Sequence, residues 1–148
     1  MYGGLYEWGE AVQYQDGASN NTSPIPAFTG NIQGICPTGF NIPSEDDFRT
    51  LEMYLGMSLS DAIKINAYRG TDQGTQLKFG GSSQWEGLLG GVKSGSSFFY
   101  IGTFGDFTTS LEVSSTNYRH RALDISQTGV NSSQNGKTAG ISVRCIKN

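Results

Sequence analysis

The sequence has little charge and no long apolar run. Charged residues make up only 16% of its 148 positions, and 13 Asp and Glu outnumber 10 Lys and Arg. This acidic balance argues against a nucleic-acid partner, which usually meets a basic patch. No apolar stretch approaches the roughly 20 residues that a membrane-spanning helix needs. The first residues also lack the basic and apolar regions of a secretory signal, so an export signal would have to lie outside this sequence.

Metal ligands and nucleophiles are scarce as well. His120 is the only histidine, and Cys36 and Cys145 are the only cysteines, which is too few for a four-ligand zinc site. No phosphate-binding loop, dinucleotide fingerprint or serine-hydrolase motif is present. A nucleophilic cysteine paired with His120 and two free buried cysteines remain alternatives, but a disulfide in an oxidising compartment is favoured. We predict no cofactor, no metal site and no enzymatic activity, and we leave a structural calcium ion open.

Small turn-forming residues are abundant, with 21 Gly and frequent Ser, Thr and Asn. This composition is typical of short strands joined by many turns. Residues 2–13 suggest a strand that turns into a short helix, and the polar residues 14–34 suggest a long surface loop. A second short helix is expected within residues 58–69.

The segment around residues 44–56 carries the clearest local signal. Ser44 precedes three acidic residues, Glu45 to Asp47, which is the pattern of an N-cap followed by a negatively charged first turn. Apolar residues then recur at helical spacing, and Gly56 supplies the stop. We therefore predict a helix here, and we interpret the acidic residues as helix-dipole complements in preference to a metal cluster.

From residue 70 onward the chain consists of glycine-punctuated segments that we predict as strands. They are GTQLKFGG, GLLGGVKSGSSFFYIGTFGDFTTS, NYRHRALDISQTGVNSS and AGISVRCIKN. The polar run 131–138, NSSQNGKT, is expected to form an exposed hairpin loop.

Residues 98–121 combine aromatic side chains with Ser, Thr, Gly and Arg, a composition typical of recognition surfaces. We expect Phe99, Phe104 and Phe107 to belong to the core and Tyr118, Arg119 and His120 to act as exposed anchors. The candidate ligand-binding residues are Thr108, Glu112, Asn117, Tyr118, Arg119, His120, Asn131, Ser133, Gln134 and Asn135.

Several segments, in this order, resemble one protein family. They are YGGLYEW, GICPTGFNIPSEDDFRTLEMYLG, QLKFGGSSQW, GGVKSGSSFFYIGTFGDFTTS and AGISVRCIKN. They are similar to the Fibrobacter succinogenes major paralogous domain of secreted or surface-anchored proteins in Bacteroidetes and Fibrobacteres. That family in turn resembles the C-type lectin-like fold.

The resemblance implies one α+β domain over residues 1–148, with two short helices, a twisted antiparallel sheet and long loops. It also implies neighbouring chain ends, a Cys36–Cys145 disulfide, an extracellular location and excision from a longer surface protein. The sequence departs from the family at Phe107-Thr108-Thr109-Ser110, where relatives carry two Trp and two Ser. A stretch that varies in this way suits a binding face, and residues 107–138 resemble the hypervariable region of proteins diversified by retroelements.

Three functions are open at this point. The favoured one is a non-enzymatic module that binds a surface protein or a glycan through the face formed by residues 107–138. The second is an assembly or tip domain of a surface filament, docking through a sheet edge. The third is a polysaccharide hydrolase that uses Asp106 and Glu112, which would have to lie about 5–9 Å apart across a cleft.

Overall fold

The computed structural model describes residues 2–148. In chain order, its elements are β1 (Leu5–Tyr6), α1 (Trp8–Ala11), a 3-10 helix (Gln15–Gly17), β2 (Phe40–Asn41), α2 (Glu45–Tyr54), α3 (Leu59–Ala62), β3 (Ala67–Arg69), α4 (Gln73–Leu77), β4 (Val92–Ser94), β5 (Ser97–Phe99), β6 (Phe104–Ser114), β7 (Asn117–Asp124), β8 (Val130–Gly136), β9 (Ile141–Ser142) and β10 (Ile146–Lys147). No helix in the described part of the chain has both the length and the apolar character needed to cross a membrane.

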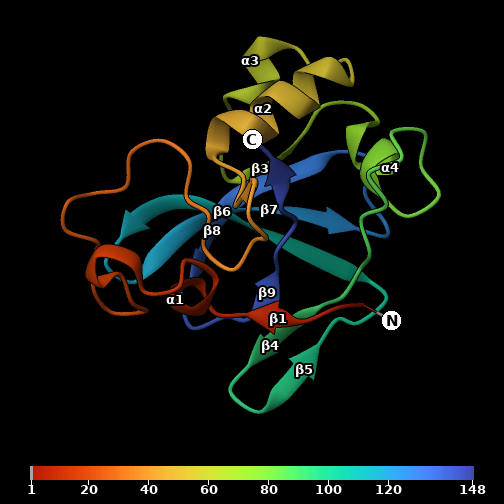
Figure 1. Ribbon diagram of the computed structural model, residues 1–148. Helices are drawn as coiled ribbons and strands as arrows, with labels where there is room; N and C mark the ends of the chain where they lie inside the picture. Colours follow the sequence, from red (N-terminus) through yellow and green to blue (C-terminus); the bar gives the residue numbers. More distant parts are fainter. Residues whose placement is uncertain (1) are drawn as a thin grey trace.

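A six-stranded sheet in the order β1-β9-β6-β7-β8-β3 organises the molecule. Its strands pair antiparallel except β6 and β9, which meet in parallel at Phe107 and Ser142. Pairing of β1 with β9 brings the N- and C-terminal segments side by side, as the family resemblance implies. Figure 1 shows α2 and α3 on one side of this sheet and the β4–β5 hairpin on the other. The predicted α+β class is therefore confirmed.

Helix α2 begins and ends where the sequence predicts. The Ser44 side chain accepts a hydrogen bond from the backbone N–H of Asp47, and the Asp47 carboxylate accepts one in return from the N–H of Ser44. This reciprocal capping box satisfies two backbone donors at the start of the helix. Gly56 follows the end of the helix with a φ of +98°, a conformation that favours glycine.

The secondary structure differs from the prediction in two places. GTQLKFGG contains the helix α4 instead of a strand, so the described residues form four α-helices where the family resemblance implies two. A Cβ atom at Gly74 would lie 2.0 Å from the carbonyl oxygen of Gly129, so only glycine lets this helix pack so closely. The run 131–138 is not a hairpin loop, because strand β8 occupies most of it and pairs with β7 and β3.

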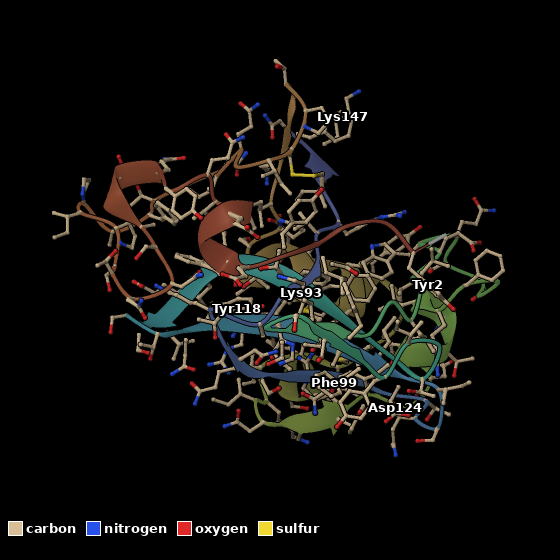
Figure 2. All side chains as sticks on the ribbon, turned by 90° about the horizontal axis from the view of Figure 1, so that it is seen from below. Tyr2, Lys93, Phe99, Tyr118, Asp124 and Lys147 are labelled. Carbon is tan, nitrogen blue, oxygen red and sulfur yellow. A yellow bond between two sulfur atoms is a disulfide. The ribbon has the colours of Figure 1, made fainter. Side chains whose placement is uncertain are left out.

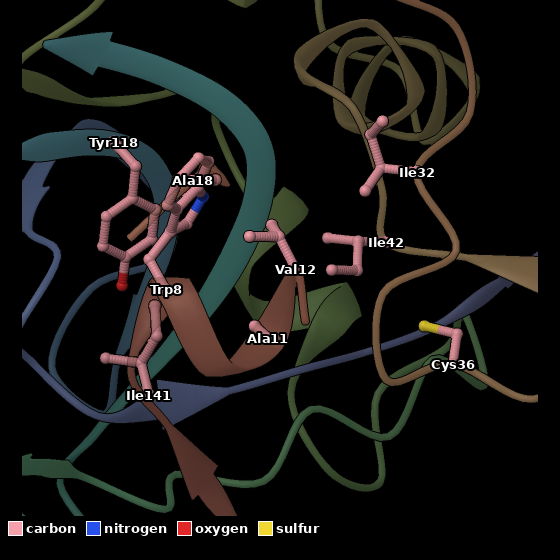
Figure 3. Packing of buried hydrophobic residues seen from close by; sticks show 9 residues of the cluster. All are labelled: Trp8, Ala11, Val12, Ala18, Ile32, Cys36, Ile42, Tyr118 and Ile141. Atoms are coloured by element: carbon pink, nitrogen blue, oxygen red, sulfur yellow. The ribbon is translucent and has the colours of Figure 1, made fainter. Parts of the chain in front are cut away.

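Two apolar clusters fill the two sides of the sheet. One gathers Trp8, Val12 and Ile42 with Tyr118 and Ile141 beneath the N-terminal segment (Figure 3). The other packs Phe48 of α2 against Phe107, Leu123 and Val130 of the sheet, with Leu77. Each cluster thus joins a helix to the same sheet, from opposite faces.

A disulfide ties the C-terminal segment to the first cluster. Cys36 and Cys145 are joined with an S–S distance of 2.05 Å and a Cα–Cα distance of 5.7 Å. This confirms the predicted pairing and leaves no free cysteine in the described chain.

A buried ionic network attaches α2 to the sheet. Glu52 Oε1 accepts hydrogen bonds from Arg69 on β3 and from Arg121 on β7, each at 2.7 Å. Arg121 also donates to both oxygens of Glu45 and to the hydroxyl of Ser132. Since buried charges are tolerated only when they are paired, this network fixes the position of α2 on the sheet.

Candidate functional site

A groove of about 640 Å³ lies between the β4–β5 hairpin and the face of the sheet that α2 does not cover. Its lining residues are Val92, Ser94, Phe99, Tyr100, Thr103, Phe104, Asp106, Asp124 and Asn135. Figure 2, seen from below, places Phe99 beside Asp124 near one end of β7, whereas Tyr118 lies toward α1. The volume falls within the range of about 300–1,000 Å³ that is usual for small-ligand sites.

The hairpin that forms one wall is held in a defined position. Its turn contains only Gly95 and Ser96, and Gly95 has a φ of +58° at the position where a type II′ turn requires glycine. Reciprocal backbone hydrogen bonds of 2.8 Å join Lys93 to Gly140, next to β9. The wall is therefore fixed to the sheet before any ligand arrives.

Aromatic rings dominate this wall. The ring of Tyr100 lies 6.2 Å from that of Phe99 and 6.4 Å from that of Phe104, measured between centroids. Phe99 is 47% exposed and Tyr100 is 68% exposed. The expectation that Phe99 belongs to the core is therefore wrong, and Phe104 is only half-buried, while Phe107 is buried as predicted. The hairpin stands away from the sheet and leaves these rings accessible.

The sheet supplies a polar floor. Asp106 on β6, Asp124 on β7 and Asn135 on β8 all line the groove. Hydrogen bonds from the hydroxyl and the backbone N–H of Ser126 lower the pKa of Asp124, so this carboxylate stays ionised. The Tyr68 hydroxyl donates to its other oxygen at 3.3 Å. Burial, followed by the charge of Asp124, raises the pKa of Tyr68 to about 12.

Three side chains form a row across the central strands. His120 Nδ1 lies 3.2 Å from Asp106 Oδ1, and His120 Nε2 lies 2.8 Å from the hydroxyl of Ser133. Asp106 is only 2% exposed. Within the described chain, no donor completes a well-aligned hydrogen bond to Asp106 Oδ1, and His120 Nδ1 has no aligned partner either. The row thus contains a buried carboxylate, Asp106, one oxygen of which has no hydrogen bond from the described residues.

Six predicted binding residues project from the groove-side face of the sheet. The register of β6, β7 and β8 places them there because alternate residues of paired strands share a face. They are Thr108, Tyr118, His120, Asn131, Ser133 and Asn135. Of these six, Asn135 is the one that lines the groove.

The role of exposed anchor that we predicted for Tyr118 and His120 is wrong. Tyr118 is wholly buried, with its ring 6.3 Å from that of Trp8, and His120 is 5% exposed. Thr108 is buried as well, at 2% exposure. Tyr118 is covered because Trp8 of α1 and its neighbours in the first apolar cluster pack on this part of the sheet.

The other predicted binding residues lie elsewhere. By strand alternation, Asn117, Arg119 and Gln134 project from the opposite face, the one that carries Arg121. Glu112 pairs with the buried ammonium of Lys137, which also donates to backbone carbonyls of the N-terminal loop. The pair of acids expected for a hydrolase, Asp106 and Glu112, is therefore not brought together in the groove.

A protein-family model describing the Fibrobacter succinogenes major domain matches residues 1–147. The chain belongs to this family. No curated protein and no solved structure matches the chain. The family resemblance seen in the sequence is thus confirmed.

In this Fibrobacter succinogenes major domain, the sequence prediction missed several residues on both sides of the groove. Asp124, Ser94 and Thr103 line it but were not predicted as binding residues. The aromatic run that ends at Tyr100, next to the Gly95 turn, is the signal that could have located the hairpin wall. Within residues 2–148, no group of three or more His, Cys, Asp or Glu side chains is placed to hold a metal ion.

Proposed function

We propose that this domain is a non-enzymatic recognition module that binds a glycan in the groove between the β4–β5 hairpin and the sheet. The observation that carries the proposal is the combination of exposed rings, Phe99 and Tyr100, with polar side chains, Asp106, Asp124 and Asn135, around one groove. Aromatic rings offer broad apolar contact at low entropic cost, and carboxylates and amides accept and donate hydrogen bonds to hydroxyl groups. The proposed site overlaps the face formed by residues 107–138 but is centred closer to the hairpin.

We also propose a C-type lectin-like fold and an extracellular location. The paired chain ends and the disulfide between the C-terminal segment and the core support the likeness to that fold. Disulfides persist mainly in oxidising compartments, which supports secretion or surface display. A role in filament assembly stays an alternative that a blank binding assay would favour.

A glycan array probed with and without calcium tests the recognition function. The variants are Tyr100→Ala, in the groove, and the control Tyr54→Ala on α2, whose side chain is 86% exposed. We expect specific binding by the wild-type domain, a loss of roughly tenfold or more for Tyr100→Ala, and no change for Tyr54→Ala. A blank array from folded protein, or equal binding by both variants, would overturn the proposal.

Ester hydrolysis is a second candidate, favoured by the row of Asp106, His120 and Ser133. Its contacts of 3.2 Å and 2.8 Å follow the order of an acid, a base and a nucleophile in acyl-transfer enzymes. It ranks second because Asp106 Oδ1 and His120 Nδ1 are not aligned for a hydrogen bond in the described chain. A fluorophosphonate probe should label Ser133 if this activity exists, with Ser133→Ala as the control, and intact mass without an adduct would exclude it.

Glycoside hydrolysis has less support. The two acids in the groove are Asp106 and Asp124. A glycosidase needs one carboxyl group with a raised pKa to act as the general acid. The pKa of Asp124 is lowered by its hydrogen bonds with Ser126, so Asp124 is unsuited to that role.

A further inference from the structure

The groove is lined by negatively charged side chains, and no positively charged side chain of the described chain lines it beside them. Among the described residues that line it, two are aspartates and none is lysine or arginine. Asp106 is the more buried of the two, at 2% exposure, and its Oδ1 lacks an aligned hydrogen-bond donor in the described chain. Because hydrogen bonds from a cationic donor to a carboxylate are stronger than neutral ones, a positively charged group in the groove would stabilise these two carboxylates.

Two nearby basic side chains, Lys78 and His120, already make hydrogen bonds of their own. The Lys78 ammonium donates to the backbone carbonyls of Asp124 and Gln127, at 2.8 and 2.7 Å. The imidazole of His120 contacts Asp106 from within the sheet at 3.2 Å and bonds to Ser133 on its other side. Neither side chain is among the groove's lining residues. Asp106 and Asp124 therefore line the groove without a lysine or arginine among the other described lining residues.

The aromatic wall adds to this preference. Phe99, Tyr100 and Phe104 line the groove together with the two aspartates. The faces of aromatic rings attract cations, most strongly where water is partly excluded. An anionic ligand would meet two carboxylates and the negative faces of these rings, and it is disfavoured on both counts.

We propose that the groove selects a glycan that carries a free, protonated amino group, such as an amino sugar without its N-acetyl group. In this arrangement the ammonium donates to Asp106 and Asp124, and the sugar ring packs on Tyr100 or Phe99. The hydroxyls of Ser94 and Thr103 and the amide of Asn135, which also line the groove, meet the sugar hydroxyls. The inference rests on the proposed function and adds the chemical class of the ligand to it.

Calorimetric titration with two matched probes tests the inference. The probes are a chitosan tetramer, which carries free amines, and a chitin tetramer of the same length, in which each amine is acetylated. We expect the chitosan tetramer to bind roughly tenfold tighter or more, because hydrogen bonds to charged groups exceed neutral ones by that amount. Equal affinities would overturn the amine selectivity and leave the glycan groove standing, whereas binding of neither tetramer, with a blank array, would remove both.

Variants locate the selectivity. Asp106→Asn and Asp124→Asn keep the side-chain shape and remove one charge each. Either should reduce chitosan binding roughly tenfold while changing chitin binding by less than about threefold. The matched control is Asp61→Asn, a half-buried carboxylate on α3 that pairs with Lys64 outside the groove. If Asp106→Asn fails to fold, Asp124→Asn alone is used for the test. An unchanged ratio of chitosan to chitin affinity in Asp124→Asn would contradict the proposal.

Two further measurements distinguish an amino sugar from other positively charged ligands, namely a basic peptide and a calcium ion. A lysine-rich peptide that binds more tightly than the chitosan tetramer would overturn the amino-sugar assignment in favour of a protein ligand. Calcium that competes with the chitosan tetramer at millimolar concentration would overturn the ammonium assignment in favour of a metal ion. Neither effect is expected, and weak peptide binding together with calcium-independent chitosan binding would support the proposal.

Discussion

At Tyr118 the ring and the hydroxyl have different energetic roles. The ring is wholly buried against Trp8, but the hydroxyl has no hydrogen-bond partner among the described residues. Truncating a buried aromatic side chain leaves a cavity, whereas removing an unpaired hydroxyl loses little.

We therefore expect Tyr118→Ala to lower the free energy of unfolding by about 3–5 kcal/mol and Tyr118→Phe to change it by less than about 1 kcal/mol. Urea denaturation of the two variants measures both values. Tyr118→Phe should also bind ligand like the wild type, because the residue does not line the groove. A folded, stable Tyr118→Ala variant that has lost binding would instead support the exposed anchor that the sequence suggested.

Tyr68 makes stability depend on alkaline pH. Burial, reinforced by the charge of Asp124, raises its pKa from 10.0 to about 12. Between these values the unfolded chain has lost the phenolic proton and the folded chain has kept it. The unfolded state then binds fewer protons, so the free energy of unfolding falls as the pH rises through this window.

We expect Tyr68→Phe to flatten this dependence. Urea denaturation at several pH values between about 9 and 12 should give a shallower slope for the variant than for the wild type. Tyr118, whose pKa is also raised by burial, remains in both proteins and keeps some slope in each. Identical slopes would show that Tyr68 titrates normally in the folded state.

At the scale of elements, the attachment of α2 to the sheet depends on Glu52. Its side chain is fully buried, and one oxygen bonds both Arg69 and Arg121. Glu52→Gln removes the negative charge between two guanidinium groups and should cost about 3–5 kcal/mol of unfolding free energy. The control on the same helix is Asp46→Asn, whose side chain is 86% exposed and which should cost less than about 1 kcal/mol. Similar losses from both substitutions would contradict a dominant role for the buried network.

Elements with strong local signals were predictable from the sequence, and those that depend on distant partners were not. The ends of α2 follow from Ser44 and Gly56, whose effects are local. Helix α4 depends on the close approach of Gly74 to Gly129, and β8 depends on strands on both sides of it. A window of sequence contains neither partner, so composition alone suggested a strand and a loop there.

The same reasoning applies to the candidate site. Aromatic, Asn and Ser residues are concentrated in residues 98–138, and Phe99, Tyr100 and Asn135 of this segment line the groove. Which of these side chains reach the groove depends on strand register and on what covers each face. Strand register determines the contact between Asp106 and His120, and the covering of the sheet face determines the burial of Tyr118.

At the scale of the whole molecule, the Cys36–Cys145 disulfide closes a loop over most of the chain. Cross-linking residues 109 positions apart restricts the unfolded ensemble, which stabilises the fold by roughly 4–5 kcal/mol in the chain-entropy account. We expect the double variant Cys36→Ser, Cys145→Ser to lose stability of this order and wild-type protein in a strong reductant to match it. Unchanged denaturation midpoints in both would show that the core holds the chain ends without the cross-link.

At the scale of the whole molecule, we propose that ligand recognition takes place in one preformed groove, held by the sheet on one side and the hairpin on the other. Both walls are fixed by backbone hydrogen bonds, so binding should need little rearrangement. Tyr100 lines the groove from the hairpin side and Asp124 lines it from the sheet, so substitutions at these two residues test both walls.

The most direct measurement is amide chemical-shift mapping of the isotope-labelled domain during titration with chitosan and chitin tetramers. The account predicts shifts concentrated in β4, β5 and the groove-side residues near Asp106, Asp124 and Asn135, larger with chitosan. Shifts confined to the surface between α2 and Trp85, or no shifts with either tetramer at millimolar concentration, would contradict it.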